Sequence, residues 1–89
     1  MEKRLFKRKA ELEKVIRTSK KRIDMYCEAL EEVSLKIQHA LNLKNPYTRH
    51  RDLELYRATR AILYIKAGHE RGKALNANLE IMRLRHFGK

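Results

Sequence analysis

From residue 9 to residue 40, apolar side chains recur at alternating spacings of four and three residues. This pattern keeps them along one side of an α-helix and is typical of the seam of a coiled coil. We therefore expect one long helix over residues 2–43, with its seam packed against another helix. The seam positions are Leu12, Ile16, Ser19, Ile23, Tyr26, Leu30, Val33, Ile37 and Ala40.

The strongest break in the helical pattern is the segment Lys44-Asn45-Pro46. Asn45 suits a helix cap, and Pro46 suits the first turn of a helix, where a backbone N–H group would have no partner anyway. The sequence predicts a turn at 44–47 and a second helix over 46–86. The expected fold is all-α, with residues 1–89 forming a single antiparallel two-helix hairpin.

The second helix carries two apolar rows. The first, named here the Gly68 row, contains small residues, and we expect it to face the first helix, with paired residue numbers that sum to about 91. Close packing against large seam side chains would offset the cost of glycine inside a helix. The members of the Gly68 row are Ala58, Ala61, Ile62, Ile65, Gly68, Gly72, Leu75, Leu79, Met82 and His86.

The second row, named here the Leu53 row, lies on another side of the same helix. Because one helix partner cannot cover both rows, we expect a second copy of the chain to cover this one. The product would be a homodimeric four-helix bundle, and the alternative is that a different protein covers the row. Its members are Leu53, Tyr56, Leu63, Ala67, Ala74, Ala77, Ile81 and Leu84.

The formal net charge of +11 is unevenly distributed along the chain. Residues 1–22 hold ten Lys and Arg against three acidic residues, and residues 66–89 hold six against two. The segment between them is balanced, with six against six. A hairpin brings the two basic segments together, so the sequence predicts a polyanionic partner, and nucleic acid is the main candidate.

The basic residues are expected to bind phosphates, with little reading of base sequence. Lys7, Lys14 and Lys21 repeat every seven residues on the side away from the seam, about 10.5 Å apart along a helix. The partner is DNA or structured RNA, which this pattern does not distinguish. The predicted nucleic-acid-binding residues are Arg4, Lys7, Arg8, Lys14, Arg17, Lys20, Lys21, Arg83, Arg85 and Lys89.

Arg49 and Arg51 form a smaller basic group in the first turn of the second helix. Cationic side chains oppose the helix dipole there, so we consider a secondary phosphate site that also uses the free amides of the helix start. The alternative is that Asp52 and Glu54 neutralise them.

Phe6 and Phe87 lie within the basic terminal segments. The hairpin would place them near each other, where they either close the end of the core or stack on bases.

Catalytic and metal chemistry are not expected. The four histidines lack metal-ligand spacing, and the single cysteine, Cys27, excludes an intramolecular disulfide. The sequence also lacks a nucleotide-binding loop, a nucleophile–histidine arrangement and paired catalytic carboxylates, so we expect neither an enzyme nor a cofactor. Without a secretory signal or a membrane span, the expected location is the cytoplasm.

These patterns together predict a non-enzymatic nucleic-acid-binding protein with a cationic helical face. The alternative function is a small adaptor or inhibitor that binds an acidic protein through the Leu53 row. Neither a membrane nor a small-molecule substrate is expected as a partner.

Overall fold

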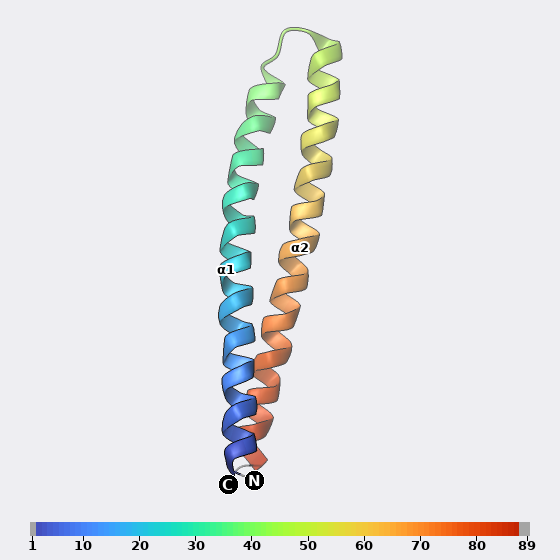
Figure 1. The fold of residues 1–89 in the computed structure, drawn as a ribbon. Coiled ribbons are helices and arrows are strands. Elements are labelled where there is room, and N and C mark those ends of the chain that lie inside the picture. The colour runs from blue at the N-terminus through green and yellow to red at the C-terminus, as the bar shows by residue number, and fades with distance from the viewer. Residues whose placement is uncertain (1, 88–89) are drawn as a thin grey trace. The chain divides into compact units, whose positions relative to one another are not determined.

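The computed structural model describes residues 2–87, with the side chains of 3–86. Within that range the chain forms two α-helices and no strand: α1 (Glu2–Leu41) and α2 (Pro46–Phe87), joined by a short turn (Figure 1). The predicted all-α class and the two helices are confirmed. The predicted helix bounds differ from the observed ones by two residues at the end of α1 and by one at the end of α2.

Local hydrogen bonds explain where the helices end. After Leu41 the helix ends in a tighter turn, in which the amide of Leu43 donates to the carbonyl of Ala40, three residues earlier, at 3.1 Å. Asn45 then caps α2, and its Oδ1 accepts from the amides of Tyr47 at 3.0 Å and Thr48 at 3.4 Å. Pro46 is the first residue of α2, as its missing N–H group predicts.

The chain divides into two compact units, and each helix contributes to both. Unit 1 comprises the described parts of Met1–Ile23 and Gly68–Lys89, and unit 2 comprises Asp24–Ala67. Within each unit a segment of α1 packs against a segment of α2. Each unit therefore buries its own apolar cluster.

The cluster of unit 2 lies next to the turn. Val33, Ile37 and Ala40 of α1 are buried together with Leu53 of α2. Half-buried apolar side chains pack against this group: Leu43, Tyr56 and Leu63. The cluster joins the predicted seam to the Leu53 row.

The cluster of unit 1 also joins the predicted seam of α1 to the Leu53 row of α2. Leu12 of α1 is buried with Ala77 and Ile81 of α2, and Ile16 and Leu84 pack against them. Buried Ser19 and buried Glu70 add a polar position to this unit. All nine predicted seam positions of α1 are buried or half-buried, which confirms the seam.

The structure corrects the predicted rotation of the second helix. The Leu53 row packs against α1 in both units, whereas the Gly68 row is exposed apart from half-buried Gly72. Two neighbours show the reversal: Ile81 is 6% exposed and Met82 is 63% exposed. The residues predicted to form an oligomer or partner face are therefore buried or half-buried within the chain: Leu53, Tyr56, Leu63, Ala67, Ala74, Ile81 and Leu84.

The Leu53 row rather than the Gly68 row faces α1 because of the contacts that each row can make with the seam. The Leu53 row supplies larger apolar side chains to unit 2. Glu70, which interrupts this row in the sequence, lies against Ser19 of the seam. The Gly68 row would set glycine and alanine against the large seam residues. The predicted pairing sum of about 91 agrees with the ion pairs Arg8–Glu80 and Arg22–Glu70, whose numbers sum to 88 and 92.

Candidate nucleic-acid interface

Unit 1 holds nearly all of the excess charge. Its two segments contain fifteen Lys and Arg against five acidic residues, a net charge of +10 out of the +11 of the whole chain. Unit 2 contains seven against six. Apart from residues 66 and 67, which belong to unit 2, the two basic segments predicted from the sequence thus fall in one compact unit.

The acidic side chains described in unit 1 are all engaged in ion pairs. Glu70 pairs with Arg22 at 3.2 Å and with Lys73 at 3.5 Å, and Glu13 lies 4.0 Å from Lys9. Glu11 and Glu80 both pair with Arg8, at 3.4 and 2.9 Å. These acids neutralise four cations and leave the other described Lys and Arg of unit 1 without an acidic partner.

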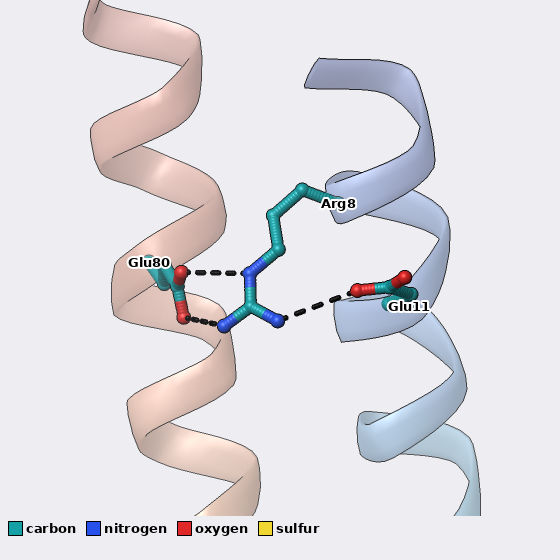
Figure 2. A network of polar contacts seen from close by, with 3 residues as sticks. All are labelled: Arg8, Glu11 and Glu80. Carbon is teal, nitrogen blue, oxygen red and sulfur yellow. Dashed lines mark hydrogen bonds and ion pairs between the residues drawn. The ribbon is translucent and has the colours of Figure 1, made fainter. Parts of the chain in front are cut away.

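Arg8 is the predicted phosphate-binding residue that the structure assigns to a different role. Its Nε and Nη2 donate to the two carboxylate oxygens of Glu80 at 2.9 and 3.0 Å, so the guanidinium forms a two-pronged contact from α1 to α2 (Figure 2). Its Nη1 donates to Glu11 at 3.4 Å. The hydrogen bond to Glu80 raises the pKa of Arg8. Because its donors are occupied inside unit 1, we remove Arg8 from the set.

The remaining predicted cations that the structure describes are exposed and carry no ion pair. On α1 they are Arg4, Lys7, Lys14, Arg17, Lys20 and Lys21, and on α2 they are Arg83 and Arg85. Lys89 lies outside the described residues. Lys3 and Arg71 are also exposed and unpaired in unit 1, and the predicted set did not include either of them.

Glu70 forms a buried polar centre in unit 1. It is 5% exposed, and burial alone would raise its pKa. Hydrogen bonds from Ser19 and Arg22 and the charge of Lys73 outweigh burial and hold its pKa below the ordinary value. Its Oε2 is buried and accepts no hydrogen bond. The carboxylate thus holds two of the unit's cations in place between α1 and α2.

A shallow hollow of about 310 Å³ lies beside this centre. Lys14, Arg22 and Lys73 line it, together with Thr18, Ser19, Val15 and Glu11. Arg22 and Lys73 already contact Glu70, so Lys14 is the unpaired cation of the hollow. The hollow supplies hydroxyl and ammonium donors, which suit a phosphate oxygen.

At the predicted phosphate site of Arg49 and Arg51, several hydrogen-bond donors already contact neighbouring residues. Arg51 lies 3.4 Å from Asp52, and His50 lies 3.3 Å from Glu54. The amides of Tyr47 and Thr48 donate to Asn45 rather than to solvent. The local arrangement favours neutralisation by acidic neighbours, so this site is not part of the function proposed below.

Phe6 does not close the core of unit 1. Its side chain is 72% exposed, between the unpaired cations Arg4 and Lys7 in the sequence. The side chain of Phe87 is outside the described part of the chain. An exposed ring beside cations has the chemistry to stack on a base.

Within the described residues, no helix has an apolar stretch long enough to cross a membrane. In the same range, no group of three His, Cys, Asp or Glu side chains is arranged to hold a metal ion. Comparison with protein-family models, curated proteins and solved structures finds no match to this chain. Functional inference therefore depends on the chemistry of unit 1.

Proposed function

We propose that this protein is a non-enzymatic nucleic-acid-binding protein that contacts DNA or structured RNA through unit 1. The observation that supports this most strongly is the surplus of exposed, unpaired Lys and Arg in a unit of net charge +10. Like charges held close together repel each other, and a polyanion removes that repulsion. Unit 2 folds with nearly balanced charge, so the surplus is not needed for helix packing.

The proposed mechanism is contact with phosphates. Lys7, Lys14 and Lys21 lie about 10.5 Å apart along α1, a spacing that follows from seven residues of helical rise. Arg83 and Arg85 bring further cations from α2 in the same unit. Phosphate contacts fix the position of a protein on a duplex and carry no sequence information, so we expect modest sequence preference.

The functional form that we propose is a dimer in which two hairpins form a four-helix bundle. A hairpin leaves one side of each helix without a partner, and a second copy provides the missing side. The Leu53 row is packed inside each unit, so the dimer must use another surface.

The test compares two charge reversals of equal size. Lys7→Glu, Lys14→Glu and Lys21→Glu together should lower the affinity for a labelled duplex at least about 100-fold at 150 mM salt, since each lost phosphate contact removes one counterion-release term. The salt slope should fall by about three units for the same reason. Fluorescence anisotropy with duplex DNA, duplex RNA and single strands, with heparin as competitor, measures both quantities.

The matched control changes three exposed cations of unit 2: Lys36→Glu, Arg57→Glu and Lys66→Glu. This variant has the same net charge as the unit 1 variant, and it should lose far less affinity. Equal losses in the two variants, or displacement of every nucleic acid by heparin, would mean that the charge acts only as a general background. The proposal would then be abandoned.

A further inference from the structure

The Gly68 row is an apolar row that is exposed, apart from half-buried Gly72. In unit 2 it exposes Ile65 to 72%, and in unit 1 it exposes Leu75 to 60% and Met82 to 63%. Such side chains in a regular row mark a protein–protein contact surface. Its core positions repeat at alternating spacings of three and four along α2: Ala58, Ala61, Ile65, Gly68, Gly72, Leu75, Leu79 and Met82.

We infer that a second copy of this chain covers the Gly68 row, with the two α2 helices antiparallel and the two-fold axis near residue 70. This inference rests on the dimer in the proposed function and specifies its surface and its orientation. Four observations support it: the two glycines, the exposed area, the order of residues along the row and the distribution of charge.

The glycines have no explanation inside the chain. A Cβ atom built on Gly68 or Gly72 meets nothing within 4 Å, so neither glycine makes room for α1. Glycine destabilises a helix interior relative to alanine. Its presence at two positions four apart is explained when the backbone of another helix approaches at that point.

The exposed area is large for a chain of this mass. The accessible surface is 7664 Å², whereas a globular monomer of 10.7 kDa exposes about 5,500 Å². The surplus of about 2,000 Å² per chain exceeds the roughly 800 Å² that each partner contributes to a standard interface. A second copy of this chain that covers the row can therefore bury as much surface as an interface needs.

The order of residues along the row favours the antiparallel orientation. With the two-fold axis at residue 70, a residue of one copy faces the residue of the other copy for which the two numbers add up to 140. Under this rule every core position of the row faces another core position of the same row. At the two ends of the row small faces large, because Ala58 meets Met82 and Ala61 meets Leu79. Nearer the axis Ile65 meets Leu75, and Gly68 meets Gly72 where the two backbones approach. In a parallel pair each residue would face its own copy. Leu79 would crowd against Leu79, and Ala61 opposite Ala61 would leave a gap.

Charge supports the same orientation. A parallel pair would bring the two units of net charge +10 together, whereas an antiparallel pair sets unit 1 of each copy beside the nearly neutral unit 2 of the other. Repulsion between like charges is smaller in the second arrangement.

Cross-linking tests the orientation directly. In a Cys27→Ala background, a chain with Ile65→Cys is mixed with a chain with Leu75→Cys, and disulfides form under mild oxidation. Antiparallel pairing predicts a mixed disulfide and little cross-linking of either chain alone, because residue 65 and its copy lie about 15 Å apart along α2. Efficient cross-linking of either chain with itself, without the mixed product, would overturn the orientation.

Sedimentation tests the surface. Wild type should have twice the chain mass of 10.7 kDa at micromolar concentration, and Leu75→Glu should be monomeric with unchanged helicity. Asn76→Glu is the matched control, because it adds the same charge at an exposed neighbour and should remain dimeric. Gly68→Ala with Gly72→Ala should raise the melting temperature of the Leu75→Glu monomer and, in the wild-type background, weaken dimerisation at least tenfold.

A wild-type monomer, or a dimer that Leu75→Glu leaves intact, would overturn the inference, as would binding of a different protein to the row with no self-association. Failure here is distinguishable from failure of the nucleic-acid proposal. The monomeric Leu75→Glu variant retains every cation of unit 1, so its affinity for a single duplex measures nucleic-acid binding independently.

Discussion

Units 1 and 2 are built from the same two helices but hold them together in different ways. Unit 2, which contains the turn, packs the apolar cluster around Val33, Ile37 and Leu53, and no ion pair joins α1 to α2 among its residues. Unit 1 buries a smaller cluster around Leu12 and adds ion pairs between the helices, at Arg8–Glu80 and Arg22–Glu70.

The difference reflects the distance from the turn. Near the turn, the short connection itself limits how α2 can shift along α1, and apolar packing completes the arrangement. Far from the turn in sequence, apolar packing alone permits alternatives, and specific polar contacts select one of them. The cations that unit 1 does not use in these contacts are the ones we assign to nucleic acid.

The strongest test of the observed rotation of α2 compares two neighbouring residues of unit 1. Ile81→Asp should lower the free energy of unfolding by at least about 3 kcal/mol, because it removes a buried side chain and buries a carboxylate. Met82→Asp, at an exposed position, should change the stability of the hairpin by less than about 0.5 kcal/mol. Chemical denaturation of both variants in the monomeric Leu75→Glu background measures this. Equal effects would contradict the rotation.

A second, smaller effect concerns Glu70, for which unit 2 has no counterpart. Its folded pKa lies below the ordinary value of 4.5, so it contributes stability above that pH and loses the contribution as the pH falls through the folded pKa. The stability difference between wild type and Glu70→Gln should therefore shrink between pH 6 and pH 3. Glu13→Gln, at an exposed glutamate of the same unit, is the control. A difference that stays constant with pH would contradict the proposed balance of burial and pairing.

The smallest expected effect is the coupling between Arg8 and Glu80. A double-mutant cycle with Arg8→Ala and Glu80→Ala should show a favourable coupling that weakens as salt is raised, because both side chains are partly exposed. Nucleic-acid affinity should fall less in Arg8→Ala than in Lys14→Ala, since the guanidinium of Arg8 is already occupied. A larger loss of affinity in Arg8→Ala would return Arg8 to the binding surface.

Much of the hairpin could be read from the order of residues. The spacing of Leu12, Ile16, Ser19 and the positions that follow identified the buried side of α1, and Asn45-Pro46 located the start of α2. The clustering of cations at both ends of the chain also predicted which residues share unit 1.

The rotation of α2 could not be read in the same way. The Gly68 row and the Leu53 row both repeat at coiled-coil spacing when Arg60 and Glu70 are included in the second, so periodicity does not choose between them. One signal was present: Ser19 is the only polar seam residue, and Glu70 stands at the matching position of the Leu53 row. The Leu53 row was expected to face outward because the glycines and alanines of the Gly68 row suit close packing against the large seam side chains.

The sequence by itself determined the local properties of this protein: which segments are helical, where they end and where the charge lies. These follow from the spacing of neighbours along the chain and from residue type. Only the tertiary structure decided which row of α2 meets α1, and with it which cations are engaged in pairs. That choice depends on long-range contacts such as Arg8–Glu80 and Ser19–Glu70, whose energies exist only once both helices are in place.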